Sequence, residues 1–137
     1  SPSRGLGDVY KRQQTDSVAK TKKPYSQGIK VTSGPLLFTS GVVARDPQGN
    51  MVGRGDIREQ TRQCIRNITG IIAGGGGTIN DLVKMTVYIT DKENYRGMNE
   101  VREETLGQID FASSTVQVVL NEPDALIEIE AVATINE

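Results

Sequence analysis

Two carboxylates, Glu128 and Glu130, lie within the run DALIEIEAVA at residues 124–133, which otherwise consists mainly of small and branched apolar residues. The alternation of apolar and polar residues predicts a β-strand with one buried face. Ile127 and Ile129 share the face that suits a core, so both glutamates must point the other way. A carboxylate there can take a proton from water, whereas burying it without a partner would cost several kcal/mol.

The composition is that of an ordinary folded domain without a surplus of charge. The chain has 137 residues, of which 36% are hydrophobic and 24% charged, and its formal net charge is −1. This length suits one domain with a single core of two packed layers. Neither disorder nor charge-driven binding of a polyanion fits these values. Only 4% of the residues are aromatic and Trp is absent, which also argues against a nucleic acid partner.

Histidine is absent and Cys64 is the one cysteine. A lone cysteine excludes an internal disulfide and indicates a reducing compartment. Without histidine the chain lacks the commonest general base and metal ligand, so we expect neither a metal site nor a cofactor. Catalysis would have to depend on carboxylates, Tyr, Lys, hydroxyls, backbone groups and water.

The hydrophobic stretches are too short for a membrane protein. None approaches the ~20 apolar residues of a membrane span, and no charged-then-apolar leader is present. We therefore expect a cytoplasmic protein that makes no membrane contact.

The first thirteen residues, SPSRGLGDVYKRQ, read as an appendage. They lack a starting Met and show neither helical nor strand periodicity. Residues 8–13, DVYKRQ, resemble the translation of a transposon end used in preparing sequencing libraries, which suggests an artefact in a metagenomic sequence and a lost native start. The alternative is a native flexible tail. In either case we expect residues 1–21 to be an extension outside the domain.

The pattern of the rest predicts seven elements in the order β-β-α-β-α-β-β. Turn chemistry at Ser33-Gly34-Pro35 separates two short apolar runs, which indicates a hairpin. Asp56 and Asp91 can each cap a helix that follows. The expected elements are a hairpin at 28–44, a helix from 57 to the glycines at 74–77, a helix at 92–107, and strands at 81–90, 114–120 and 126–135.

These elements favour an α+β fold in which two helices cover one face of a single mixed sheet. The second face would carry Leu126 and Val132 beside the two glutamates, so it is neither plainly apolar nor plainly solvated. Two helices cannot cover both sides of a sheet, and such a face usually meets another subunit. Oligomerisation is therefore expected.

Several segments in order resemble the RidA/YjgF family of small trimeric imine and enamine deaminases. The resemblance spans roughly residues 22–136, within an expected single domain at 22–137. The matching segments are KPYSQGIKV, LLFTSGVV, QTRQCIRNITGIIAGGGGTINDLVKMTVYITD, YRGMNEVREE and IEIEAVA.

The resemblance implies a chorismate-mutase-like subunit, a homotrimer and small-molecule clefts between neighbouring subunits. It also implies hydrolysis of a 2-imino or 2-enamino acid to the 2-keto acid and ammonia. In that scheme an Arg holds the substrate carboxylate, a Glu handles water, and a Tyr and backbone groups line the pocket.

Carried over by position, the catalytic Glu is Glu128 and the pocket Tyr is Tyr25. The Thr-Ser-Gly motif contributes Ser40 and Gly41, and the helix Asn of the family is Asn99. For Glu128 the alternative is a glutamate held by hydrogen bonds in a subunit interface, and for Tyr25 it is simple packing. Glu130 is expected to be structural, paired with a Lys or Arg across the subunit interface.

The Arg does not carry over. The family has Pro-Ala-Arg-Ser before the strand, whereas this chain reads Phe-Ala-Ser-Ser-Thr at 111–115, which places Ser113 where the Arg should be. A serine cannot make the bidentate guanidinium contact. The hydroxyls of Ser113 and Thr115 can still bind a ligand, and Arg45 is a possible substitute for the missing group.

Three functions follow as hypotheses. The first is a hydrolase of imines, enamines or related carbonyl-derived metabolites, with an altered substrate. The second is a non-catalytic trimeric protein that binds or senses a ligand. The third, an endoribonuclease or translation inhibitor, has the least physical support because histidine, a basic patch and stacking rings are all missing.

Overall fold

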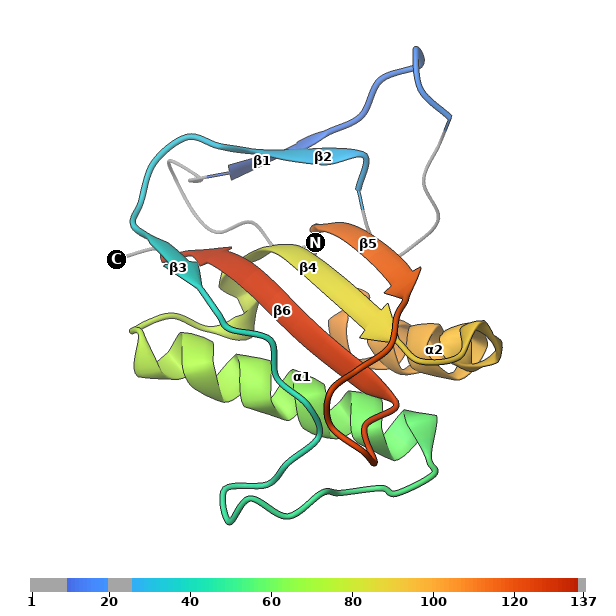
Figure 1. Cartoon of the computed structure of the whole chain (residues 1–137). Helices are drawn as coiled ribbons and strands as arrows, with labels where there is room; N and C mark the ends of the chain where they lie inside the picture. Colours follow the sequence, from blue (N-terminus) through green and yellow to red (C-terminus); the bar gives the residue numbers. More distant parts are fainter. Residues whose placement is uncertain (1–9, 20–25, 136–137) are drawn as a thin grey trace.

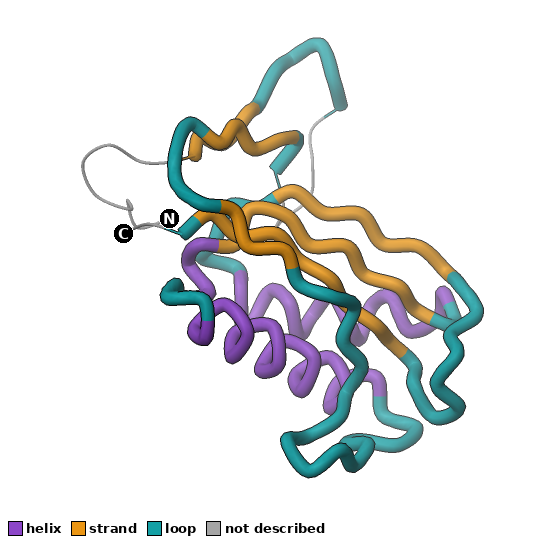
Figure 2. Tube along the Cα trace, turned by 60° about the vertical axis from the view of Figure 1, so that its left-hand side comes forward, coloured by secondary structure: helices purple, strands orange, loops and turns teal. Residues whose placement is uncertain are grey.

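A computed structural model describes residues 10–19 and 26–135. Figure 1 shows a twisted sheet with both helices on one side, and Figure 2 shows the same two layers from another direction. The helices are α1 (Ile57–Gly74) and α2 (Tyr95–Leu106), and short 3₁₀ turns, η1 and η2, lie at Ile79–Asp81 and Lys92–Asn94. The strands are β1 (Tyr10–Gln13), β2 (Gly28–Val31), β3 (Leu36–Phe38), β4 (Leu82–Ile89), β5 (Ala112–Gln117) and β6 (Ile127–Thr134).

The main sheet has four strands in the order β3-β6-β4-β5. The β4–β5 pair is parallel, and β6 is antiparallel to both of its neighbours. This mixed sheet with two helices on one face confirms the predicted fold class. The parallel pair follows from the chain path, because α2 crosses over between β4 and β5.

The predicted hairpin at 28–44 is wrong. β2 pairs with β1 in a separate two-stranded sheet, and β3 pairs with β6 in the main sheet. Residues 10–13 thus form a strand although they lack strand periodicity. A turn at Ser33-Gly34-Pro35, with Gly34 at φ 98°, does separate the two runs. Turn chemistry marks where a strand ends but does not select its partner.

The core lies between the sheet and the helices. In β6, Ile127, Ile129 and Ala131 are buried and alternate with the half-buried Glu128 and Glu130, as the pattern predicted. Within the described ranges, no helix is long and apolar enough to cross a membrane.

Local signals explain α1 well. The Asp56 side chain accepts hydrogen bonds from the backbone N–H groups of Arg58 (3.0 Å) and Glu59 (3.2 Å), which caps the first turn. The helix ends at the glycine run, where Gly76 adopts φ 93°.

Gln60 of α1 is fully buried although the pattern did not assign it to the core. Its amide nitrogen donates to the carbonyls of Gly53 (3.2 Å) and Asp124 (3.0 Å), and its oxygen accepts from the N–H of Leu126 (2.8 Å). These bonds join the start of α1 to the turn that precedes β6.

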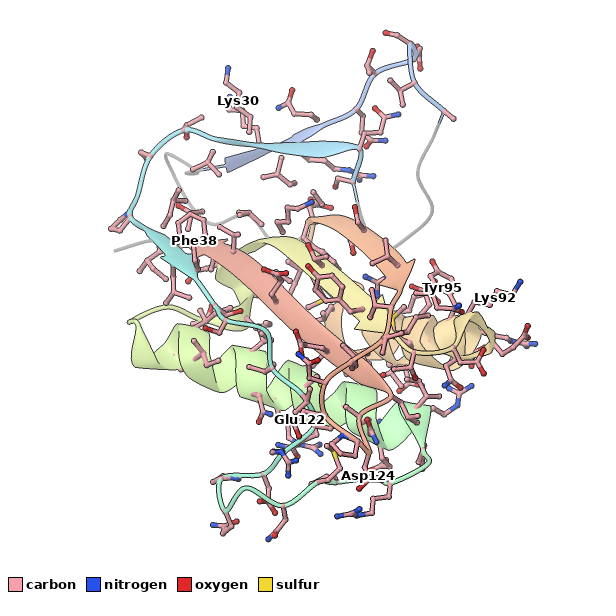
Figure 3. All side chains as sticks on the ribbon, in the orientation of Figure 1. Lys30, Phe38, Lys92, Tyr95, Glu122 and Asp124 are labelled. Atoms are coloured by element: carbon pink, nitrogen blue, oxygen red, sulfur yellow. The ribbon has the colours of Figure 1, made fainter. Side chains whose placement is uncertain are left out.

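Two ion pairs hold the same turn from outside. Arg45 pairs with Glu122 at 2.6 Å, and Arg54 pairs with Asp124. Figure 3 shows Glu122 and Asp124 on the turn, close to the loop that leads into α1. The turn between β5 and β6 is therefore held by one buried amide and two surface contacts.

Candidate active site

A cleft of about 250 Å³ opens on the sheet face that the helices leave uncovered. Its walls come from Tyr88 of β4, residues 118–121 after β5, and Glu128 and Glu130 of β6. The segment 118–121 leads directly into the turn that Gln60 holds. The cleft thus combines two carboxylates, a phenol, an amide and apolar side chains.

The register of β4 against β6 brings these groups together. Tyr88 lies directly opposite Glu128, and Thr86 lies opposite Glu130. The hydroxyl of Tyr88 nevertheless donates a hydrogen bond to the carboxylate of Glu130, two residues along β6. This bond, partial burial and the charges of Glu130 and Glu128 raise the pKa of the Tyr88 phenol above its usual value.

Glu128 lies against Gly41. The segment before Gly41 follows β6, because the N–H of Thr39 donates to the carbonyl of Ala131 (2.9 Å). After it, Val42 and Ile129 exchange two backbone hydrogen bonds of 2.8 and 2.9 Å. A Cβ on residue 41 would lie 2.8 Å from Cδ of Glu128 and closer still to its oxygen. A larger residue at 41 would displace this carboxylate from its present place.

The carboxylate of Glu128 makes no hydrogen bond or ion pair with any other residue in 10–19 or 26–135. The negative charge of Glu128 acts on the thiol of Cys64, which is fully buried in α1. Burial, together with the charge of Glu128, raises the pKa of the Cys64 thiol to about 12. Cys64 is thus an inert core residue, as expected, while Glu128 keeps its oxygens available.

A second cluster of predicted site residues meets at Arg102 of α2. The Arg102 guanidinium is fully buried and donates from Nη1 to Oγ of Ser113 (2.7 Å) and from Nη2 to Oδ1 of Asn99 (2.9 Å). Asn99 and Ser113, which the resemblance assigned to the site, therefore share one partner. The position that carries a serine in place of the family Arg is hydrogen-bonded to another Arg.

The two clusters lie on opposite faces of the sheet. Ser113 is the neighbour of Met85, a fully buried residue that faces the helices, whereas Glu128 is the neighbour of Tyr88 on the open face. Neighbouring side chains in a sheet project to the same face. A single chain therefore does not bring Glu128 and Ser113 into one pocket.

The remaining predicted residues are distributed as follows. Ser40 is exposed next to Gly41, and its carbonyl accepts the hydroxyl of Thr39 at 2.8 Å. Thr115 is half-buried on the same face of β5 as Ser113, next to Val87. Tyr25 lies outside the described residues.

One expected cation contact differs from what the structure shows. The Arg45 guanidinium pairs with Glu122 and donates to the carbonyl of Gly49 (2.7 Å), so both contacts hold it in its own loop and it does not replace the missing Arg. Within the chain Glu130 accepts a phenol hydrogen bond from Tyr88, and its pairing with a Lys or Arg across a subunit interface stays a prediction.

Sequence reasoning overlooked Tyr88 and Arg102. Tyr88 has the strand phase that places it on the uncovered face, and pairing that strand with the last one would have brought it next to the glutamates. Arg102 lies four residues after Met98 and four before Leu106, both inward on α2, but a charged residue is seldom assigned to a core.

Replacing Gly41 tests the close approach to Glu128. We expect Gly41→Ala to lower the free energy of unfolding by at most about 1 kcal/mol, because the new methyl group displaces the carboxylate at the end of a flexible side chain. Combining it with Glu128→Ala should cost less than the sum of the two single changes. Urea denaturation measures both values.

Gly70→Ala is the matched control. Gly70 lies inside α1, and no neighbouring atom lies within 4 Å of the place that an added methyl group would take, so alanine there should stabilise the helix. Equal effects of the two substitutions would contradict the close contact between Gly41 and Glu128.

The comparisons with known proteins agree with one another. Residues 15–135 match the model of the family described as Endoribonuclease L-PSP. A RutC family protein of Pyrococcus horikoshii is 41% identical over 119 residues, which cover 87% of this chain and 93% of the relative. TdcF of Escherichia coli, provisionally named a reactive intermediate deaminase, is 34% identical over 113 residues, which cover 80% of this chain and 85% of TdcF.

Solved structures show the same fold. The crystal structure of E. coli TdcF with bound serine superposes with a TM-score of 0.69 at 33% identity, covering 92% of this chain and 99% of TdcF. A Rid family protein of unknown function from Yersinia pestis gives a TM-score of 0.74 at 26% identity, covering 93% and 99% of the two chains. Because the family model matches most of the residues, and relatives above 30% identity align over most of their length, this chain belongs to the RidA/YjgF family.

Proposed function

We propose that this protein is a hydrolase of small imines, enamines or related carbonyl-derived metabolites. The observation that carries the proposal is the Glu128 carboxylate, which lies in a cleft of about 250 Å³ beside Gly41 with its oxygens uncommitted in the described chain. A cleft of this size suits a metabolite of few atoms. Membership of the RidA/YjgF family and the name of TdcF support the same reaction class.

The proposed reaction needs one group that can accept and return a proton. Water attacks the C=N carbon while Glu128 takes a proton from it, and Glu128 returns that proton to the nitrogen, which becomes an amine as the C–O bond forms. The resulting carbinolamine then collapses: Glu128 takes the hydroxyl proton and passes it to the nitrogen, the C=O bond forms, and the C–N bond breaks to release ammonia. One water is consumed for each ammonia and each carbonyl compound formed.

The Arg102 cluster is proposed to receive the acidic end of the substrate. Because Arg102 donates to Oγ of Ser113, the hydroxyl hydrogen of Ser113 is free to point at a ligand. The nearby guanidinium charge strengthens that donor. In this proposal Ser113 touches the substrate carboxylate and Arg102 acts through it, which offsets part of the lost family Arg.

A homotrimer is proposed because Glu128 and Ser113 lie on opposite faces of one subunit. They can serve the same substrate only where the open face of one copy meets the β5 edge of another. The open face also carries exposed apolar residues: Leu36 is 49% and Phe38 69% exposed on β3, and Val116 is 45% exposed on β5. Apolar residues on such a face are typical of subunit interfaces.

RNA is a poor candidate ligand despite the description of the family model. A phosphodiester brings negative charge, and the cleft presents two carboxylates, Glu128 and Glu130. Proteins that bind RNA phosphates place Lys or Arg there instead. A binding protein without catalysis is the second candidate, favoured by Ser113 at the Arg position.

Native mass spectrometry tests the assembly. We expect the wild-type chain at three chain masses, and Phe38→Lys at one, because a lysine at a buried interface costs more than the contact gains. Phe38 and the control position Lys92 are labelled in Figure 3, with Lys92 at the helical side of the molecule. Lys92→Glu should remain trimeric, and a monomeric wild-type protein would refute the shared cleft.

A coupled assay tests the reaction. An amino acid dehydratase generates the 2-imino acid in situ, and the release of keto acid and ammonia is timed against buffer. We expect acceleration by the wild-type protein and a loss of about 10²–10⁴-fold in Glu128→Gln, because the amide cannot accept a proton. Glu93→Gln is the control for a remote carboxylate. A wild-type rate equal to buffer would leave the binding-protein alternative.

An exchange of two residues tests the proposed carboxylate contact. Arg102→Ser should raise KM for the imino acid about 10- to 100-fold, since a charge-assisted hydrogen bond is lost. Ser113→Arg alone would press a second guanidinium against Arg102, so the informative rescue is the double variant Arg102→Ser with Ser113→Arg. Recovery of KM supports the proposal. An Arg102→Ser variant that stays folded, by circular dichroism, with an unchanged KM contradicts it.

A further inference from the structure

Glu128 and Glu130 are two residues apart on one strand face, which separates their backbones by about 7 Å. Both line the same half-buried cleft, and both are acids of the same type. Two equivalent carboxylates at this distance repel each other and would compete for one ligand proton. Some feature of the cleft must make them unequal if one of them is to act as the base.

The difference between them in this structure is Tyr88. Its hydroxyl donates to Glu130 and not to Glu128, although Glu128 is its direct neighbour across the strands. The other side chains on this face near Tyr88 are the neutral Thr86, Ser114 and Val116. Asn121 of the cleft wall is also neutral.

One further charged group faces the same side. Lys84 lies on the face of β4 that carries Tyr88, but it is exposed, and its neighbour on β6 is Val132, beyond Glu130. No ion pair joins it to either glutamate in the described part of the chain. Within the described part of the chain, the phenol is therefore the side-chain hydrogen-bond donor that distinguishes the two carboxylates.

We propose that Tyr88 is a positioning residue that holds Glu130 by a hydrogen bond and thereby leaves Glu128 as the single proton acceptor of the cleft. This inference rests on the proposed function. It adds a specific requirement: the hydroxyl must remain a donor throughout the working pH range. The raised pKa of the phenol meets this requirement, because the protonated donor persists past the usual value near 10.

The linkage has a definite sign. A phenol whose pKa is higher in the folded protein stabilises the fold fully below its ordinary pKa, and this contribution is lost as pH rises through the raised pKa. Replacing the charged acceptor by a neutral one should reduce the upward shift of the Tyr88 pKa. In Glu130→Gln the phenol of Tyr88 should titrate at lower pH, as followed by tyrosinate absorbance and identified by its loss in Tyr88→Phe.

The functional experiment compares Tyr88→Phe, Glu130→Gln and the double variant in the imine assay, from about pH 6 to about pH 9. Tyr88→Phe should lower kcat about tenfold with little change in KM, because the ligand still binds but Glu128 is no longer the sole acceptor. Glu130→Gln should keep a kcat near that of the wild type, because it removes the competing carboxylate. The double variant should recover most of the kcat that Tyr88→Phe loses, since it has no second acceptor.

The acidic limb of the kcat profile provides the readout that a purely structural role would not move. In Tyr88→Phe it should shift to higher pH, because a released Glu130 can share a proton with Glu128. Tyr95→Phe is the matched control: it removes the same hydroxyl from Tyr95, which lies on α2 in Figure 3 and packs against the core. The dependence of kcat on pH in Tyr95→Phe should match that of the wild type.

The outcomes separate the two proposals. Wild-type turnover with an unchanged kcat and pH profile in Tyr88→Phe overturns the role of Tyr88 and leaves the proposed function intact. A wild-type rate equal to buffer overturns both. If Tyr88→Phe fails to fold by circular dichroism, Glu130→Gln decides: a folded Glu130→Gln whose kcat falls as far as that of Glu128→Gln shows that Glu130 is itself an acceptor and overturns the inference.

Discussion

The register of β6 between β3 and β4 is the constraint on which the rest of the site depends. It places Ile127, Ile129 and Ala131 against the helices and Glu128 and Glu130 on the open face. A slip of one residue would bury both carboxylates and expose three core residues. The same register that closes the core therefore fixes which groups face a ligand, and stability and chemistry cannot be changed independently along this strand.

Close packing then refines what the register allows. Backbone hydrogen bonds from Thr39 and Val42 hold the chain along β6, and Gly41 lets the Glu128 carboxylate lie against the backbone, a place from which a side chain at 41 would displace it. On the other face, Arg102 crosses from α2 to Ser113 on the edge strand β5. The two faces carry complementary chemistry, a proton acceptor on one and a cation on the other, in a subunit that separates them.

Local patterns predicted the elements well and the long-range contacts poorly. The Asp56 cap, the glycine run after α1 and the alternation in β6 each depend on residues near one another in sequence. Gln60, Tyr88 and Arg102 do not: each has a partner that is distant in sequence, at separations of 64–66, 42 and 11 residues, respectively. The pairing of β2 with β1 was missed for the same reason. A polar side chain becomes acceptable inside a protein only through partners that tertiary structure supplies.

Family resemblance assigned Glu128 and Gly41 to one site, and the structure places the two in contact. The same resemblance raised the question of Ser113, but it could not show that a guanidinium from α2 lies against that serine. The segment around Ser113 lacks the family arginine when the sequence is read alone. In the folded chain, Arg102 of α2 places a cation beside the same position.

Gln60 holds the turn before β6 solely through backbone groups: the carbonyls of Gly53 and Asp124 and the N–H of Leu126. The exposed side chains of the adjoining wall, Val119 and Asn121, are not part of that anchorage. They are therefore free to vary over evolutionary time while the main chain keeps its course. Substitutions at these wall positions can change which ligand the cleft binds while the backbone stays in place. A family whose members share one fold can acquire new ligands in this way.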